Sequence, residues 1–223
     1  MTSFTPCLDT LPAPQRSLWD QLHDTPAGFT LYGGTAIALR LGHRISVDLD
    51  FFSAQAFTPN ALMARVPYLQ GGTLRHSAPN TLTCTLDRGG PVQVSFFGGL
   101  SLGQVAPTEE AAGPGIQVAS LIDLAGTKIA VITQRAELKD YLDIHALLTQ
   151  AKIPLPNMLA AAVIIYGGQF SPLLALKALA YHGDAALADL SADTRHDLVA
   201  AIPGVDPEHL PALETVRRHG ERR

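Results

Sequence analysis

Hydrophobic and polar residues alternate after Ser46, and this alternation predicts a β-strand that ends at Phe52. Successive side chains of a strand point to opposite faces, so Val47, Leu49 and Phe51 share one face. Asp48 and Asp50 share the other face. The pattern therefore predicts a half-buried strand that carries two neighbouring carboxylates on its polar side.

A short apolar helix is predicted immediately before this strand. Gly33 and Gly34 form a turn after an apolar run, and Thr35 is an acceptable N-cap residue for the helix. The helix is expected to end at Gly42, because glycine is the usual residue just after a helix. A glycine turn that opens a helix presents backbone N–H groups at the positive end of the helix dipole. This turn is therefore a candidate phosphate site.

The same patterns predict further elements on both sides of this region. A loop rich in glycine and proline over residues 98–115 separates a sheet-forming part from a helical part, so we expect domains at 1–115 and 116–223. The expected elements are a helix over 13–24, a helix opening at Thr58–Pro59, strands over 72–76, 81–87 and 91–97, helices over 120–134 and from Lys139, and C-terminal helices over 157–166, 172–182, 192–200 and 207–219.

Asp48 and Asp50 allow two interpretations. Both carboxylates can lie in water on a solvated strand face, which is the more common outcome for an isolated Asp-x-Asp pair. Alternatively, they hold a divalent cation, Mg²⁺ or Mn²⁺, since hard oxygen ligands suit a metal that also binds phosphates. The neighbouring glycine turn favours the metal.

Lys128 is a single cation within the apolar helix predicted over 120–134. A buried ammonium without a partner is costly, so Lys128 must reach either solvent or an anion, and a phosphate would serve. Arg135 follows near the same helical face, while Asp140 and Asp143 share one face of the next helix. Taken alone, these aspartates are typical of a charged first helical turn.

Composition narrows the class of protein without identifying a partner. The 223 residues are 47% hydrophobic and 16% charged, which is typical of a globular protein, and the net charge of −4 gives no overall basic field for nucleic acid. Cys7 and Cys84 fit no metal-ligand spacing, and the eight histidines show no close pairing. With no signal peptide or ~20-residue apolar span, we expect a cytoplasmic protein without a membrane partner.

The glycine turn and the Asp-x-Asp strand together resemble the polymerase-beta type of nucleotidyltransferase. Their amino-acid sequence is similar to that of the AbiEii toxin family of type IV toxin–antitoxin systems. The similarity covers residues 28–150 and includes Lys128 followed by Asp140 and Asp143. It implies an α+β fold in which a mixed, twisted sheet is flanked by helices, with a C-terminal helical region. It also implies metal ligands Asp48 and Asp50, nucleotide contacts Gly33, Gly34, Thr35, Ser46 and Arg135, and catalytic roles for Lys128 and Asp140.

One expected feature of the family is missing. A third carboxylate usually lies on a later strand, and Ser95 occupies the nearest equivalent place, with Asp87 as either a substitute or an ordinary turn residue. The resemblance implies transfer of a nucleoside monophosphate from an NTP to an acceptor hydroxyl, with tRNA ends as acceptors and an antitoxin encoded nearby. Two alternatives stay open: a nucleotide-binding or interaction module without turnover, and a transferase that modifies a small molecule such as an antibiotic.

Overall fold

The computed structural model describes residues 2–217, 219 and 220. These residues form two compact units: the described parts of Met1–Ser101 and Thr108–Ala119 make the first, and those of Leu102–Pro107 and Ser120–Arg223 make the second. The predicted division between residues 115 and 116 stays a prediction. None of the helices in the described residues is long and apolar enough to span a bilayer.

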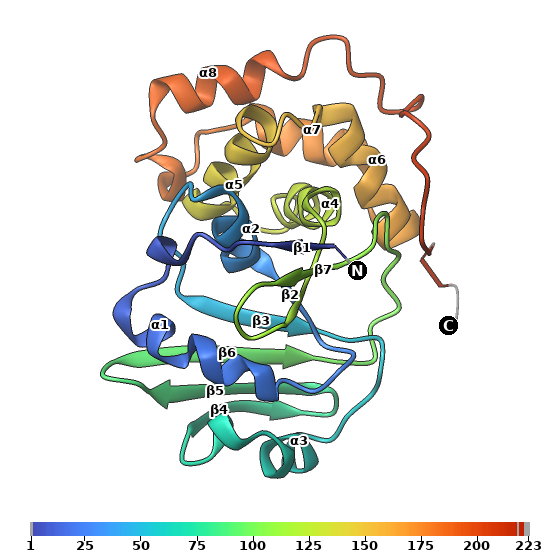
Figure 1. Cartoon of the computed structure of the whole chain (residues 1–223). Coiled ribbons are helices and arrows are strands. Elements are labelled where there is room, and N and C mark those ends of the chain that lie inside the picture. The colour runs from blue at the N-terminus through green and yellow to red at the C-terminus, as the bar shows by residue number, and fades with distance from the viewer. Residues whose placement is uncertain (1, 218, 221–223) are drawn as a thin grey trace. The chain divides into compact units, whose positions relative to one another are not determined.

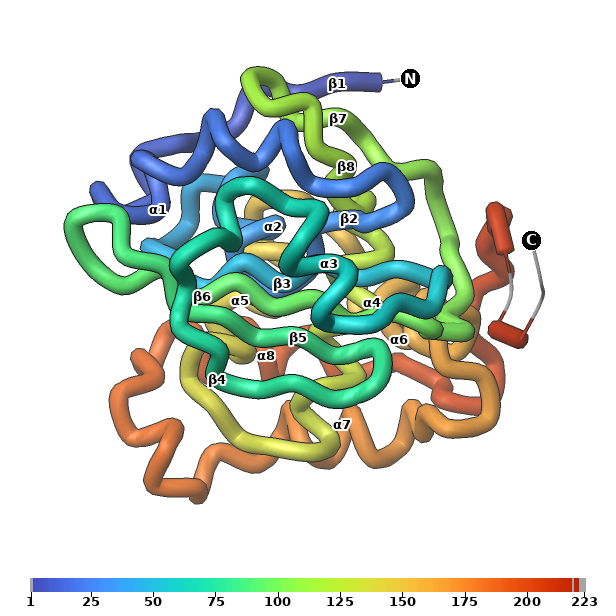
Figure 2. The backbone as a smooth tube through the Cα atoms, turned by 90° about the horizontal axis from the view of Figure 1, so that it is seen from below, coloured from blue at the N-terminus to red at the C-terminus, as the bar shows by residue number. Residues whose placement is uncertain are grey.

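The first unit is built on a mixed eight-stranded sheet, counted over the described residues, with the order β1-β7-β8-β2-β3-β6-β5-β4. β3 pairs in parallel with β6 and antiparallel with β2, and β6, β5 and β4 run side by side to the sheet edge (Figure 2). The strands are β1 (Ser3–Phe4), β2 (Thr30–Tyr32), β3 (Asp48–Phe52), β4 (Thr73–Ala78), β5 (Thr81–Asp87), β6 (Pro91–Phe97), β7 (Glu109–Ala111) and β8 (Gln117–Val118).

The two faces of the central strands differ as the alternating pattern predicts. Leu49 and Phe51 of β3 are fully buried, and the rings of Phe51 and Phe96 stack with their centroids 5.2 Å apart. The opposite face of β3 carries Asp48 and Asp50. Val47 departs from the pattern, because β3 begins only at Asp48 and the Val47 side chain is exposed.

Three α-helices accompany the sheet in the first unit: α1 (Ala13–Trp19), α2 (Gly33–Leu41) and α3 (Pro59–Arg65). α1 packs against β6 (Figure 1). The helix predicted over 13–24 changes to a 3-10 helix over Asp20–Asp24. Thr58 and Pro59 begin α3 as predicted, and Gly42 ends α2 in the left-handed conformation, with φ +67°.

The prediction of a plain loop over residues 98–115 was wrong in part, because β7 forms within it and β8 follows shortly after. β7 pairs in parallel with β1, and β8 pairs in parallel with β2. These strands have only two or three residues, so no alternating pattern marks them in the sequence.

The second unit is helical. Its α-helices are α4 (Leu121–Val131), α5 (Leu138–Thr149), α6 (Leu155–Tyr166), α7 (Pro172–Ala180) and α8 (Ala192–Ala200). α4 lies between α5 and α6 and packs against both (Figure 1). Val105, Ala161, Ile164 and Ile165 form a buried apolar cluster in this unit.

The helix predicted over 207–219 was wrong, because the described residues of this range contain no helix. A proline at position 211 removes a helical N–H and its ring clashes with the preceding turn. Arg217 instead forms an isolated β-bridge with Gln104. Arg218, which also falls in the predicted range, lies outside the described residues.

Candidate functional site

The carboxylates of β3 lie on the polar face of the sheet beside two neutral side chains of β6. Asp48 is the register partner of Gln93, and Asp50 is the register partner of Ser95. Gln93 donates an amide hydrogen bond to Asp48 over 3.5 Å. Asp48 and Asp50 are both partly exposed, so the pair is close to water and yet fixed by the strand.

The glycine turn at the start of α2 approaches Asp50 closely. Gly33 has φ +78°, a left-handed conformation that favours glycine. A Cβ atom at Gly33 would lie 3.0 Å from Oδ2 of Asp50, a tight contact that would require the carboxylate to shift. Tyr32, at the N-cap, provides no side-chain hydrogen bond to the first turn of α2. The positive helix end and the carboxylate pair therefore adjoin within one unit.

Thr35 does not cap the helix, which corrects the sequence prediction. α2 begins two residues earlier, at Gly33, and Thr35 lies inside its first turn. The buried Thr35 hydroxyl contacts Ser46 Oγ at 2.8 Å and also donates to the backbone carbonyl of Asp48. Thr35 and Ser46 thus fix the start of β3, and any phosphate contact by Thr35 would use its backbone N–H group.

Ser95 occupies the position beside Asp50 where a third carboxylate would point. Its side chain is buried, and its hydroxyl lies 3.4 Å from that of Thr83 on β5. Asp87 is the last residue of β5, and its side chain holds the turn that follows, because its Oδ1 accepts hydrogen bonds from the backbone N–H groups of Gly89 and Gly90. These contacts favour the turn role of Asp87 over that of a substitute acid.

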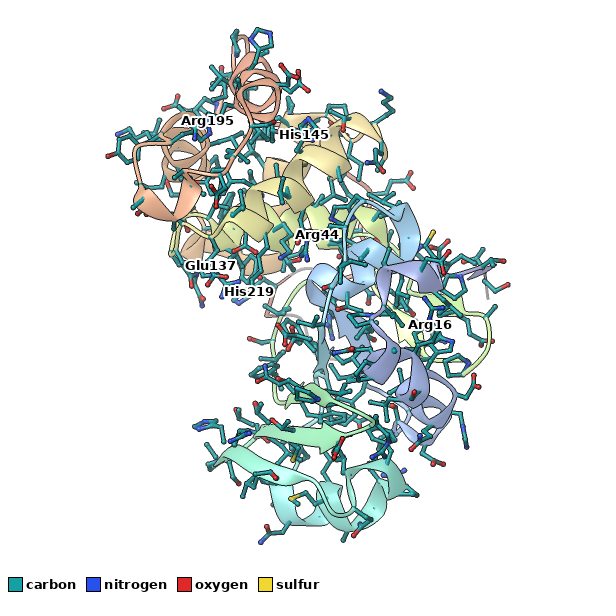
Figure 3. All side chains as sticks on the ribbon, turned by 90° about the vertical axis from the view of Figure 1, so that its left-hand side faces the viewer. Arg16, Arg44, Glu137, His145, Arg195 and His219 are labelled. Carbon is teal, nitrogen blue, oxygen red and sulfur yellow. The ribbon has the colours of Figure 1, made fainter. Side chains whose placement is uncertain are left out.

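A second cluster, in the helical unit, joins Lys128 to two carboxylates of α5. The Lys128 ammonium lies 2.7 Å from Asp140 Oδ1 and 2.8 Å from Asp143 Oδ2. Arg135 Nε donates to Asp140 Oδ2 over 3.0 Å, and Arg135 also pairs with Glu137, labelled in Figure 3, over 3.2 Å. Both aspartates are fully buried, while Lys128 is almost so.

This cluster decides two interpretations that the sequence left open. Of the two expected outcomes, solvent or an anion, Lys128 reaches an anion, and the anions are the protein's own carboxylates. Asp140 does lie in the first turn of α5, but both it and Asp143 are buried and paired with Lys128 instead of lying at the surface. An ammonium has three N–H donors, and the two carboxylates use two of them.

Asp123 is a buried acid, and the sequence indicated for it only a helix-capping role. Its carboxylate accepts from the backbone N–H groups of Val105 and Ala106, at 2.8 and 3.0 Å, and from the Ser120 hydroxyl. Burial raises the pKa of Asp123, and these hydrogen bonds oppose the rise. The contacts attach the segment 102–107 to the start of α4, and no sequence pattern links residues so far apart.

The donor set of the first unit fits a magnesium-type ion. Among the described residues, no group of three or more His, Cys, Asp or Glu side chains could hold a metal by itself. Mg²⁺ in phosphate-transfer sites is usually held by one or two carboxylates, with substrate phosphates and water completing its shell. Asp48 and Asp50 supply two carboxylates, and the start of α2 lies next to them.

Comparisons with known structures identify the fold. The chain resembles MenT4, a nucleotidyltransferase toxin of Mycobacterium tuberculosis H37Rv, with a TM-score of 0.60 and 15% identity, over 88% of this chain and 87% of that one. It also resembles a protein of H. pylori described as a candidate nucleotidyltransferase, with a TM-score of 0.51 and 17% identity, over 85% and 90% of the two chains. The α+β fold is thus that of polymerase-beta-like nucleotidyltransferases, as predicted.

The family follows from the sequence match. The model of the nucleotidyl transferase AbiEii toxin family, of the type IV toxin–antitoxin system, matches residues 17–218. The chain therefore belongs to this family, which confirms the resemblance. An uncharacterized protein of Aquifex aeolicus (strain VF5) is 31% identical over 122 residues, which are 54% of this chain and 57% of that protein. The match thus spans little more than half the length of that relative.

Proposed function

We propose that this protein transfers a nucleoside monophosphate from an NTP to an acceptor hydroxyl, with the nucleotide bound at β3 and the start of α2. One observation carries the proposal. Asp48 and Asp50 share a face of β3, and the left-handed Gly33 lies so close to Asp50 that a Cβ would be only 3.0 Å from its carboxylate. A carboxylate pair beside an uncapped helix start suits a metal-bound triphosphate.

Each residue of the first unit has a separate part in this proposal. Asp48 and Asp50 would hold Mg²⁺ or Mn²⁺, and the metal, when bound, would neutralise charge on the phosphates. The backbone N–H groups of Gly33, Gly34 and Thr35 would bind the outer phosphates. Ser46 acts through Thr35, since the contact between their hydroxyls fixes the start of β3.

Lys128 and Arg135 keep their predicted roles as part of the proposal, while Asp140 takes a different one. The third N–H of Lys128 could donate to an added phosphate without breaking its two ion pairs. Both oxygens of Asp140 already accept hydrogen bonds from cations. Asp140 therefore suits the positioning of Lys128 and Arg135 better than the removal of a proton from the acceptor.

The family description supports the biological part of the proposal. It names a toxin of a type IV toxin–antitoxin system. We therefore propose that the protein acts in the cytoplasm on the 3′ end of an RNA, with tRNA as the first candidate, and that a cognate antitoxin counteracts it. Expression should arrest bacterial growth, and Asp48→Asn should relieve the arrest.

The direct test uses conservative changes at the two carboxylates. Asp48→Asn and Asp50→Asn should each abolish label transfer from an α-labelled NTP to a tRNA fraction, and a chelator should do the same to the wild type. Asp87→Asn is the matched control, because it makes the same charge change at a turn where asparagine is also favoured. Transfer by Asp48→Asn equal to that of the wild type would contradict the proposal.

Ser95 specifically favours a second candidate, a module that binds nucleotide without turnover. A serine cannot act as a carboxylate base, and this one is buried beside Asp50. Calorimetry with Mg-NTP distinguishes the two candidates. Binding that is lost in Asp48→Asn, together with no labelling of RNA, protein or aminoglycoside acceptors by the wild type, would favour the module.

A further inference from the structure

Arg75 lies at an irregularity in the edge strand of the sheet. The register between β4 and β5 pairs Leu74 with Cys84 and His76 with Thr83, so Arg75 is the extra residue of a β-bulge. A bulge of this kind turns a side chain away from its regular direction. The Arg75 side chain here lies back over the sheet, where its Nε donates to Thr85 Oγ1 over 2.9 Å.

Thr85 belongs to a row of polar side chains that leads to the proposed metal site. Thr85 is the register partner of Gln93, which is in turn the partner of Asp48. Gln93 also donates to the Asp48 carboxylate over 3.5 Å. Since neighbouring strands lie about 4.8 Å apart, Thr85 on β5 is about 10 Å from Asp48 across the sheet. The Arg75 guanidinium therefore lies on the face that carries Asp48.

The Arg75 guanidinium is available to a ligand. The side chain is exposed, and within the described residues only its Nε has an acceptor, so both terminal NH₂ groups keep their donors. His76 and Gln93 are also exposed. Charged residues on edge strands often serve only to prevent aggregation. Arg75 differs from that case because the bulge directs it over the sheet face instead of outward from the edge.

The sheet order places different features on the two sides of β3. β2, which leads into the glycine turn, lies on one side, and β6, β5 and β4 lie on the other. If the outer phosphates of the NTP bind at the turn, the acceptor must approach from a different direction, because attack and departure occur roughly in line. The row from Gln93 to Arg75 is then the side left for the acceptor.

We propose that Arg75 binds a backbone phosphate of a polynucleotide acceptor, close to the 3′ hydroxyl that receives the nucleotide. This inference rests on the proposed function and adds to it the residue that selects a phosphate-bearing acceptor. A guanidinium suits phosphate because it can donate two parallel hydrogen bonds to it. A small-molecule acceptor without phosphate would gain nothing from Arg75.

The first experiment compares Arg75→Ala with Arg65→Ala. Arg65 is an exposed arginine of α3, a helix outside the polar row, so both changes remove one positive charge from the same unit. For transfer to a short RNA with a free 3′ hydroxyl, Arg75→Ala should lower kcat/KM about tenfold, mainly through the KM for RNA. The KM for NTP should not change, and Arg65→Ala should match the wild type.

Replacing single phosphates of the RNA with neutral linkages identifies the phosphate that Arg75 contacts. Methylphosphonates placed singly at the last few linkages should lower transfer by the wild type at one position, and Arg75→Ala should be insensitive to that position. Arg75→Lys should recover part of the loss, since it keeps the charge but not the paired donors. If the wild type transfers nucleotide to RNA but Arg75→Ala has no effect, the inference about Arg75 is wrong while the proposed function stands. The same holds if the losses caused by Arg75→Ala and by the methylphosphonate are additive. No transfer to RNA by the wild type would overturn it together with the RNA acceptor of the proposed function.

Discussion

Lys128→Met is the change that tests the helical cluster most sharply. Methionine keeps an unbranched apolar chain that matches the lysine stem and removes the ammonium that contacts Asp140 and Asp143. Both carboxylates are fully buried, and the loss of one partner of a buried ion pair typically costs 3–5 kcal/mol. Arg135 still pairs with Asp140, so we expect a value near the lower limit, about 3 kcal/mol.

Thermal unfolding followed by circular dichroism measures this effect. For a protein of this size, a loss of about 3 kcal/mol lowers Tm by about 6–12 °C. Lys139→Met on α5, the helix that carries both aspartates, is the control, since Lys139 is half-exposed and its pair with Glu137 is a surface contact. Removing that surface pair should cost about 1 kcal/mol or less.

A combined variant separates charge from packing. Adding Asp140→Asn and Asp143→Asn to Lys128→Met removes the buried negative charges, so most of the lost stability should return while nucleotide transfer should not. A Tm for Lys128→Met within about 2 °C of the wild type would refute the buried ion-pair network. A combined variant less stable than Lys128→Met would show instead that the aspartates stabilise the fold by contacts other than with Lys128.

Three further predictions concern other residues. Gly33→Ala should lower nucleotide transfer much more than Gly89→Ala, because both glycines have φ +78° but, of the two, only Gly33 faces a carboxylate. Transfer assays compare the two variants, and equal losses would contradict the role of the Gly33 contact. Asp123→Ala should cost about 2–4 kcal/mol in urea unfolding, since two buried donors and one partly buried donor lose their acceptor, and a loss below about 1 kcal/mol would contradict this. Burial and nearby Arg195, labelled in Figure 3, lower the pKa of His182, so its contribution to stability is full above about pH 6.5 and is lost as the pH falls through the folded-state pKa. His182→Gln should therefore make Tm less dependent on pH in this range. An unchanged pH dependence would show that His182 is not the source of this effect.

The central part of the fold could be predicted because its signals are local. The alternation around Asp48 and Asp50 specifies both the strand and its polar face, and Gly42 marks the end of the preceding helix. β5 and β6 have the predicted bounds for the same reason. The capping of α4 was also visible, since the Ser120 hydroxyl accepts from the N–H of Asp123.

The remaining features depend on contacts between distant residues. The sequence shows that Lys128 needs either solvent or an anion, but not that α5 brings Asp140 and Asp143 to it. Likewise, Thr35 looks like a helix cap until its hydroxyl is seen to hold Ser46 and the start of β3. The bulge that turns Arg75 over the sheet follows from the pairing register, which no local pattern reveals.

Comparison of α-labelled and γ-labelled NTP, with a tRNA fraction as acceptor, tests the central claim most directly. If the Asp48 and Asp50 face binds the nucleotide for nucleotidyl transfer, the α label should become attached to RNA and the γ label should leave as pyrophosphate. Asp48→Asn should abolish both events, and Asp87→Asn should leave both intact. Transfer of the γ label to RNA, or α-label transfer that survives Asp48→Asn, would contradict the account.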